Sequence, residues 1–248
     1  MNAPVTVARP TPETEPTLRL AAVAPAGPAP LVPSRRSGIG PFGRLVKRAF
    51  DLVAAAALLL ACGPLLLCLM LAIRLRYGGP VLFRQLRVTG PDRLATIVKL
   101  RTLPTHSDSD TRWVVPLPEP GLATWLRHSH LDELPQLVNV LRGDLSMVGP
   151  RPERPYFAAR FAGRIPGYAD RHRVKAGITG WAQVHGLHGD TSIADRVRLD
   201  NQYIEHWSLR LDLVILIRTL TSAVTFGLTS RPTSAARRRG GSPCESCM

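Results

Sequence analysis

The longest hydrophobic stretch of the chain is Leu52–Ile73, a run of 22 residues without a single charge. A helix of roughly 20 apolar residues is long enough to cross a bilayer. No polar face appears along the run, which argues against the buried helix of a soluble core. The run therefore predicts a membrane helix. Basic residues stand on both sides of it, namely Arg44, Lys47, Arg48, Arg74 and Arg76.

Gly63 and Pro64 interrupt the middle of this run. Proline removes one amide hydrogen bond and clashes with the preceding turn, so we expect a break or a sharp kink there. The basic flanks favour keeping both ends in the cytosol, which a re-entrant helix–break–helix hairpin would do. A kinked spanning helix is the alternative, and the run by itself favours spanning.

From Gly78 onward the pattern becomes that of a soluble domain with short strands. Pro80–Phe83 and Thr96–Val98 are short apolar segments, and the turn-forming residues Thr89–Asp92 lie between them. Such segments bounded by turn residues predict strands. The stretch Thr105–Gly121 is polar and contains prolines, which predicts a loop.

Helical patterns follow in the second half of the chain. Leu131–Leu141 predicts a helix with Pro135 in its first turn and Gly143 at its end. Apolar spacing predicts two amphipathic helices, Pro155–Arg164 and Thr191–Trp207, and an apolar segment with three charges that we expect to lie in the membrane interface, Leu209–Leu228. Residues 149–152, Gly-Pro-Arg-Pro, cannot form regular structure.

The two ends of the sequence differ in composition from the centre. Residues 1–43 are rich in proline and alanine, and residues 229–248 carry a run of arginines and glycines. Both compositions are typical of disordered segments. We therefore expect a leader at 1–43, one domain at 44–228 with its membrane helix at 44–76, and a basic tail at 229–248.

The net charge of the chain indicates the chemical class of its partners. The chain of 248 residues has 32 Lys and Arg against 18 Asp and Glu, a net charge of +14. A surplus of this size points to phosphates, carried by nucleic acid, anionic lipid or a nucleotide substrate. The four cysteines, two in the apolar run and two in the tail, do not form a disulfide framework.

Asp132 and Glu133 are the sharpest chemical feature. They precede a predicted helix, whose positive end favours the ionised carboxylate. An ionised aspartate can attack phosphorus, and a neighbouring glutamate can hold a divalent cation. Acidic residues at a helix start are also ordinary caps, and the pair alone favours that interpretation.

Basic residues that accompany the pair favour a catalytic site for a diphosphate substrate over an ordinary helix cap. Arginine forks match phosphate oxygens, and two prolines fix the backbone that presents Arg151. These basic residues are Lys99, Arg101, Arg127 and Arg151. The sequence has neither a P-loop nor a dinucleotide-binding motif. Four histidines are interpreted as loop or surface residues: His172, His185, His188 and His206.

Several ordered motifs resemble those of the bacterial sugar transferases, the monotopic polyprenyl-phosphate phosphoglycosyl transferases that begin surface glycan assembly. The resemblance runs from about residue 45 to about residue 225. The matching stretches are 47–51 (KRAFD), 79–85 (GPVLFRQ), 99–102 (KLRT), 131–136 (LDELPQ), 139–143 (NVLRG), 146–153 (SMVGPRPE), 177–183 (GITGWAQ) and 200–208.

The resemblance implies a fold, a reaction and roles for individual residues. Asp132 would be the nucleophile that takes the phospho-sugar from a UDP-sugar and expels UMP, before polyprenyl phosphate accepts it. Glu133 would be the Mg²⁺ ligand, and the four cations would shape the phosphate site. Gly63 and Pro64 would break a re-entrant helix, which reverses the preference for spanning.

The implied fold is a compact monotopic α/β core with short strands and interfacial helices. The implied location is the cytoplasmic face of the inner membrane, at the first membrane step of exopolysaccharide synthesis. The partners would be UDP-sugar, polyprenyl (undecaprenyl) phosphate and membrane lipid, with no nucleic acid. The resemblance leaves open whether the chain forms a homo-oligomer and which sugar it transfers.

The sequence departs from the family pattern in the loop 104–126, at Ala176, and at Leu100 and Leu103. Two alternatives of other classes therefore stay open. The first is a membrane-tethered protein that binds nucleic acid or anionic lipid, which the charge of +14 suggests. The second is an inactive family member that acts as an assembly partner, which the divergent loop suggests.

Overall fold

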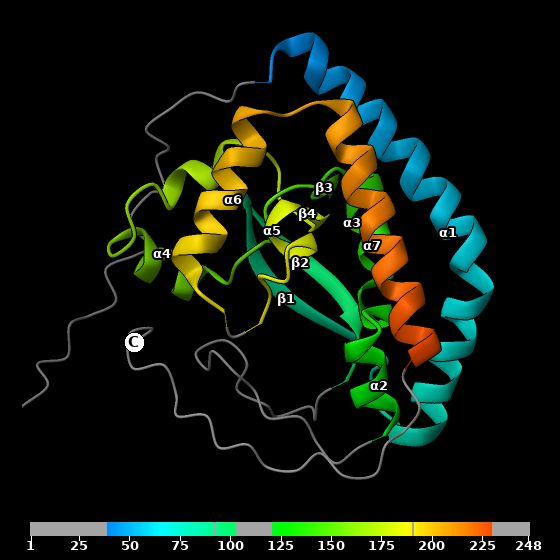
Figure 1. The fold of residues 1–248 in the computed structure, drawn as a ribbon. Coiled ribbons are helices and arrows are strands. Elements are labelled where there is room, and N and C mark those ends of the chain that lie inside the picture. Colours follow the sequence, from blue (N-terminus) through cyan, green and yellow to red (C-terminus); the bar gives the residue numbers. More distant parts are fainter. Residues whose placement is uncertain (1–38, 92, 103–120, 190, 230–248) are drawn as a thin grey trace, which may run out of the picture.

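The structure is a computed structural model that describes residues 39–91, 93–102, 121–189 and 191–229, with side chains to residue 222. It combines helices and short strands, as predicted (Figure 1). The predicted leader and tail lie outside the described residues, except that α1 already begins at Pro41 and α7 ends at Thr229. Most of the divergent loop 104–126 lies outside them too.

Helix α1, Pro41–Tyr77, contains the whole apolar run. The predicted break at Gly63 and Pro64 is wrong, because the helix continues through both residues. A proline in a continuous helix removes one amide donor, whereas an open loop in lipid would free several backbone groups. Figure 1 shows instead that α1 bends and that its two halves run in different directions, which agrees with the kink.

Four strands form two small sheets. Strands β1, Leu82–Gly90, and β2, Arg93–Leu100, pair as an antiparallel hairpin in which Leu82 faces Leu100. They are longer than predicted, because pairing also accommodates exposed polar positions such as Arg84 and Arg93. The unpredicted strand β3, Ser146–Val148, pairs in parallel with β4, Gly177–Thr179.

The helices surround these sheets. The predicted helix 131–141 divides at Pro135 into a 3₁₀ turn, η1, and a helix, α3, which ends at Gly143 in the left-handed conformation (φ 87°). The two amphipathic helices are confirmed as α4 and α6. The bounds are α2 Leu122–His128, η1 Leu131–Glu133, α3 Gln136–Arg142, α4 Pro155–Ala162, η2 Ala169–Arg173, α5 Trp181–Val184, α6 Ile193–Glu205 and α7 Leu209–Thr229.

Buried polar contacts attach α1 to the domain. The Asp51 carboxylate accepts hydrogen bonds from the Ser146 hydroxyl and the Met147 amide, both at 3.0 Å. Lys47 forms a 2.7 Å ion pair with Asp212 of α7, whose other oxygen accepts from the Tyr203 hydroxyl. Apolar residues of α1, β2, α3, β3, α6 and α7 pack around these contacts in one core cluster.

The apolar run of α1 is poorly covered by the rest of the protein. Only 11% of its most apolar window is buried, whereas a soluble core helix would be mostly buried. Leu60 is 81% exposed and Val53 is 71% exposed. Helix α7 exposes an apolar stripe of residues three or four positions apart, formed by Leu209, Leu213, Ile217 and Leu220. Among the described helices, α1 is the one long and apolar enough to cross a membrane, and it supports membrane association.

Candidate active site

The Asp132–Glu133 pair lies in η1, against strand β2. His130 precedes this turn with φ 57°, and among the described residues it is the one non-glycine residue in the left-handed region. Backbone strain of this kind is held by the surrounding structure and clusters at functional sites. Both carboxylates are buried, with 7% of each residue exposed.

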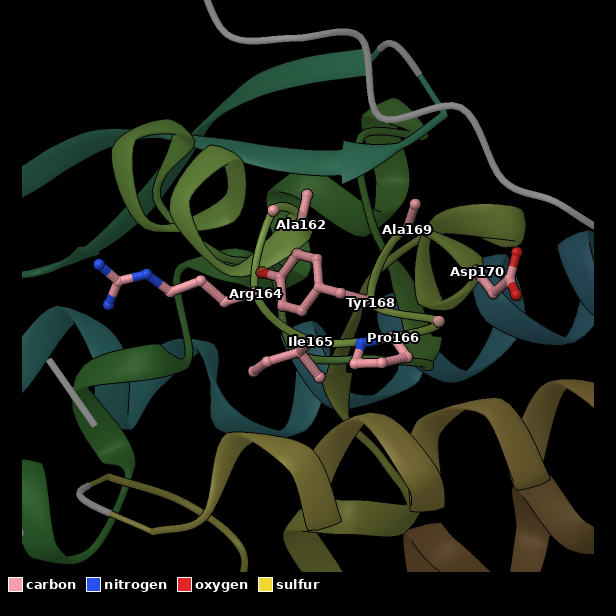
Figure 2. A pocket seen from close by; sticks show the side chains of 9 residues that line it. Ala162, Arg164, Ile165, Pro166, Tyr168, Ala169 and Asp170 are labelled. Carbon is pink, nitrogen blue, oxygen red and sulfur yellow. The ribbon is translucent and has the colours of Figure 1, made fainter. Parts of the chain in front are cut away.

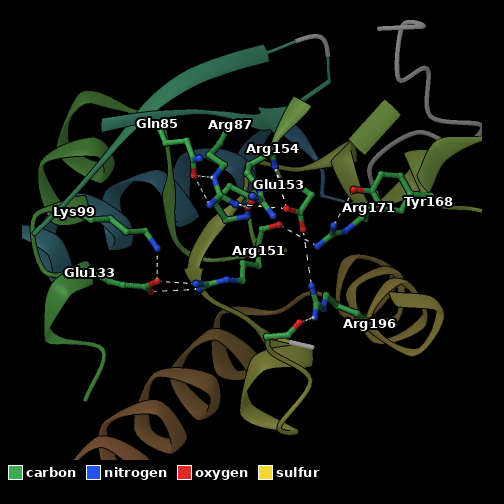
Figure 3. A network of polar contacts seen from close by, with 12 residues as sticks. Gln85, Arg87, Lys99, Glu133, Arg151, Glu153, Arg154, Tyr168, Arg171 and Arg196 are labelled. Atoms are coloured by element: carbon green, nitrogen blue, oxygen red, sulfur yellow. Dashed lines mark hydrogen bonds and ion pairs between the residues drawn. The ribbon is translucent and has the colours of Figure 1, made fainter. Parts of the chain in front are cut away.

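Two cations hold the Glu133 side chain. Its Oε1 accepts from Lys99 Nζ at 2.6 Å and from Arg151 Nη2 at 2.7 Å, and its Oε2 accepts from Arg151 Nη1 at 3.4 Å. Figure 3 shows Lys99 and Arg151 converging on Glu133 from different elements. Burial alone would raise the pKa of Glu133, but the charges of Arg151 and Lys99 hold it well below its usual value.

Asp132 differs from its neighbour in having a free carboxylate. Within the described part of the chain, no donor lies within hydrogen-bond distance of it. Burial, followed by the charge of Glu133, raises the pKa of Asp132 to about 6. This corrects the expectation that the helix start favours ionisation, because Pro135 separates the pair from a helix of only seven residues. The oxygens of Asp132 are therefore available as a nucleophile once ionised.

Close backbone packing presents Arg151 to this pair. Gly149 and Gly177 approach so closely that a Cβ on Gly177 would lie 2.1 Å from the Gly149 amide nitrogen, and a Cβ on Gly180 would lie 2.2 Å from the Gly149 carbonyl oxygen. Side chains at these positions would push the two segments apart. The glycines of two separate motifs thus bring the Pro-Arg-Pro turn onto β4.

The other two predicted phosphate ligands have different surroundings. The charge of Arg127 acts on Asp132, and its buried Nη1 has no hydrogen-bond partner in the described residues. Arg101 donates instead to the Tyr77 and Gly78 carbonyls at the end of α1. The structure therefore brings Lys99, Arg127 and Arg151 around the pair, and phosphate binding by Arg101 stays a prediction.

Sequence reasoning missed several residues of this region. The rings of His130 and His188 meet edge to face at 6.0 Å, and His188 lies within the electrostatic range of Glu133 and Arg151. The two histidines do not belong to a common sequence motif, so sequence patterns could not indicate that their rings meet. His172, interpreted above as a loop or surface residue, is buried in η2, and burial together with the charge of Arg171 lowers its pKa to about 3.

A separate hollow of about 310 Å³ lies in the loop between α4 and η2. Figure 2 shows the Tyr168 ring at its centre. All of its lining residues come from one stretch, residues 162–170. It is thus the inside of a single loop, and the Asp132–Glu133 pair takes no part in it.

Comparison with known proteins agrees with this arrangement. The family described as bacterial sugar transferase matches residues 42–226, which include α1 after its first residue, the acidic pair and the Pro-Arg-Pro turn. The chain belongs to the bacterial sugar transferase family. The resemblance drawn from the motifs is thereby confirmed, and the family's matched region ends inside α7.

Individual family members show the same relationship. A protein of Komagataeibacter xylinus named undecaprenyl-phosphate glucose phosphotransferase is 42% identical over 207 residues, which are 78% of this chain and 38% of that protein. Two proteins named UDP-glucose:undecaprenyl-phosphate glucose-1-phosphate transferase are also similar. The one from Caulobacter vibrioides is 40% identical over 220 residues (85% of this chain, 78% of that protein), and the one from Escherichia coli K12 is 37% identical over 198 residues (77% and 43%).

Length separates these sugar transferases into two kinds. The chain spans less than half of the K. xylinus and E. coli proteins and more than three quarters of the C. vibrioides protein.

Proposed function

We propose that the chain transfers a sugar 1-phosphate from a UDP-sugar to polyprenyl phosphate, releasing UMP, as the first membrane step of surface glycan synthesis. The names of the three relatives specify undecaprenyl phosphate as acceptor and glucose as the sugar. Family membership and the phosphate-matching cations support the same class of reaction.

The proposal rests on the different environments of Asp132 and Glu133. Glu133 is fixed by two cations, whereas Asp132 is buried beside the same cations with its carboxylate unpaired. A nucleophile needs free lone pairs, and a diphosphate needs positive charge around it. Asp132 and the surrounding cations meet these two requirements in one place.

In the first step an Asp132 oxygen attacks the phosphorus that bears the sugar. The bond between that phosphorus and the bridging oxygen breaks, and UMP leaves with the bridging oxygen. Lys99, Arg127 and Arg151 neutralise the charge that develops on the phosphates. In the second step a phosphate oxygen of the lipid attacks the same phosphorus, and the bond to Asp132 breaks to restore the carboxylate.

The residues present fit a bound Mg²⁺ ion. Mg²⁺ usually takes one or two carboxylates, with waters and substrate phosphates as further ligands. Within the described residues there is no cluster of three or more His, Cys, Asp or Glu, so phosphate oxygens would have to complete the site. Glu133 Oε2, whose one hydrogen bond to the described residues is the 3.4 Å contact from Arg151, would be the protein ligand. When bound, Mg²⁺ would offset the charge of the diphosphate.

We also propose that α1 enters and leaves the membrane from the cytoplasmic face. Basic residues at both ends of the apolar run and the bend in the helix support this topology. The exposed apolar stripe of α7 would then lie in the interface beside it, and the lipid acceptor would reach Asp132 from that side.

The test is a turnover assay on membranes that contain the protein. Incubation with UDP-glucose, Mg²⁺ and undecaprenyl phosphate should release UMP and form a lipid-linked diphosphate sugar. UDP-N-acetylgalactosamine in parallel would report the choice of sugar. Absence of UMP with every UDP-sugar, from protein shown to be folded, would contradict the proposal and favour the inactive assembly partner.

A further inference from the structure

Each carbonyl group of the Pro-Arg-Pro turn, Pro150–Pro152, accepts a hydrogen bond from a different residue. Pro150 O accepts from the Gly177 amide at 2.9 Å, a contact to backbone. The next two carbonyls accept from guanidinium groups of distant elements, one buried (Arg171) and one partly buried (Arg87). Arg171 Nη2 donates to Arg151 O at 3.0 Å, and Arg87 Nη1 donates to Pro152 O at 3.1 Å.

Each of these guanidinium groups is itself fixed. Arg171 is 1% exposed and forms two hydrogen bonds to Asp200 Oδ2, at 2.7 and 3.0 Å. Its third nitrogen donates to the Tyr168 hydroxyl at 3.4 Å. The Arg171 guanidinium group therefore links Asp200 of α6 to the Pro-Arg-Pro turn, and Figure 3 shows Arg171 beside Arg151.

Arg87, which donates to the next carbonyl of the turn, is held in the same manner. Its Nε and Nη2 donate to Gln85 Oε1 at 3.0 and 2.6 Å, and its Nη1 lies 3.5 Å from Glu153 Oε1. Burial is the main cause that lowers the pKa of Arg87, to about 10, so the group stays charged at neutral pH.

Such external donors have a physical reason. Proline has no amide hydrogen, so two of the three residues in the turn cannot donate to a neighbouring strand. The turn therefore cannot pair as a regular strand does along its whole length, so the carbonyls of Arg151 and Pro152 need side-chain donors, and guanidinium groups supply strong, directional ones. The side chain of Arg151 leaves this same turn toward Glu133, so any shift of the turn moves its guanidinium relative to the acidic pair.

We infer that Arg171, fixed by Asp200, is a positioning residue that holds Arg151 in its catalytic place, with Arg87 as its counterpart. The inference rests on the proposed function and deepens it. Neither residue has to touch substrate, because each acts through a carbonyl beside the Arg151 side chain. A displacement of about 1 Å in a catalytic group is enough to cost orders of magnitude in rate.

The informative variant replaces the ion pair as a unit. Arg171→Met alone would leave Asp200 buried without a partner, which unfolds many proteins, whereas Arg171→Met with Asp200→Leu removes both charges and keeps similar volumes. Lys47→Met with Asp212→Leu is the matched control, a buried ion pair without contact to the turn. If the double variant does not fold, Arg171→Lys replaces it in the experiment, because lysine keeps the charge beside Asp200 but lacks the forked guanidinium group.

The effect is measured with Arg151 present and with Arg151→Ala. With Arg151 present, the Arg171/Asp200 replacement should lower kcat/KM for the UDP-sugar at least tenfold and leave the melting temperature close to that of the control. In the Arg151→Ala background it should lower kcat/KM less than threefold, because nothing remains to be positioned. Equal effects in both backgrounds, or no effect in the first, would overturn the inference.

A second readout does not depend on turnover. The amides of Gly177 and Val88 donate to the carbonyls of Pro150 and Glu153, on either side of Arg151. Their hydrogen exchange should accelerate at least tenfold in the Arg171/Asp200 replacement and stay unchanged in the control; unchanged exchange in both would contradict the positioning role. Wild-type protein that releases no UMP would instead reject the proposed function, while the exchange data still decide the inference.

Discussion

Arg127 offers a substitution that should separate stability from activity. Its Nη1 is buried and has no hydrogen-bond partner in the described part of the chain. A buried donor without a partner costs about 1–3 kcal/mol of folding free energy. Arg127→Met keeps the apolar stem and removes that donor, so the free energy of unfolding should stay the same or rise by about 1–2 kcal/mol. For a domain of this size, each kcal/mol corresponds to roughly 2–4 °C in Tm.

The same substitution should impair the reaction. If the free donor binds a substrate phosphate, its loss removes a charge-assisted hydrogen bond of about 1.5–3 kcal/mol. At about 1.4 kcal/mol per factor of ten, kcat/KM should fall between roughly tenfold and 150-fold. Arg127 also lowers the pKa of Asp132, so the ionisation that controls activity should move to higher pH in the variant.

The assay combines UMP release at varied UDP-sugar with a thermal melt of the same preparation. Arg142→Met is the matched control, because Arg142 is the exposed last residue of α3. The control should change neither quantity beyond a factor of two in kcat/KM or a degree in Tm. An Arg127→Met protein that melts well below wild type yet keeps full kcat/KM would refute the reasoning and make Arg127 a structural residue.

Three further predictions concern pH, attachment of the membrane helix and topology. Because the nucleophile must be ionised and the pKa of Asp132 is raised to about 6, kcat/KM should rise as the pH increases from 5 to 7; a profile that is flat across this window would contradict the assignment. Asp212→Asn weakens the buried partner of Lys47 and should lower the free energy of unfolding by about 3–5 kcal/mol in urea titrations, whereas a loss below 1 kcal/mol would show that the pair contributes little. Cysteines that replace the exposed Arg44 and Arg84, on opposite sides of the apolar run, should both react with an impermeant thiol reagent only from the cytosol; reaction of the Arg44 position from outside would show a spanning helix.

Hydrophobic and polar patterns predicted the longer helices and the positions of the hairpin strands. The apolar run, the two amphipathic helices and Gly143 as the end of α3 were predicted from periodicity and capping alone. The division of the helix at Pro135 and the strand β3 were not. Three residues are too few to show a period, and β3 exists because the glycines of two distant segments allow close approach.

The candidate site was predictable as a set of residues but not as a set of contacts. Sequence motifs identified the acidic pair and the cations, yet they could not show that Glu133 is held while Asp132 is left unpaired. That difference arises from the direction in which β2 and the turn present Lys99 and Arg151. The buried role of Arg171 could not be predicted either, because Arg151 and Asp200, the partners on which that role depends, are 20 and 29 residues away in the sequence.

The pKa of Asp132 illustrates the same limit. The sequence places the residue before a helix and suggests a stabilised carboxylate, whereas burial and the charge of Glu133 raise the pKa. Desolvation depends on what packs around a group, and that information comes only from the folded chain.

The central claim is that Asp132 carries the phospho-sugar between the two substrates. It is tested most directly by intact-protein mass spectrometry after wild-type protein is mixed with UDP-glucose and Mg²⁺ in the absence of lipid acceptor. The account predicts a phospho-hexose adduct that maps to Asp132, formed together with one equivalent of UMP and discharged when polyprenyl phosphate is added. Asp132→Asn, which keeps the shape of the side chain and removes its charge, should give neither adduct nor UMP. Substantial turnover by that variant, or an adduct on another residue of the wild type, would contradict the account.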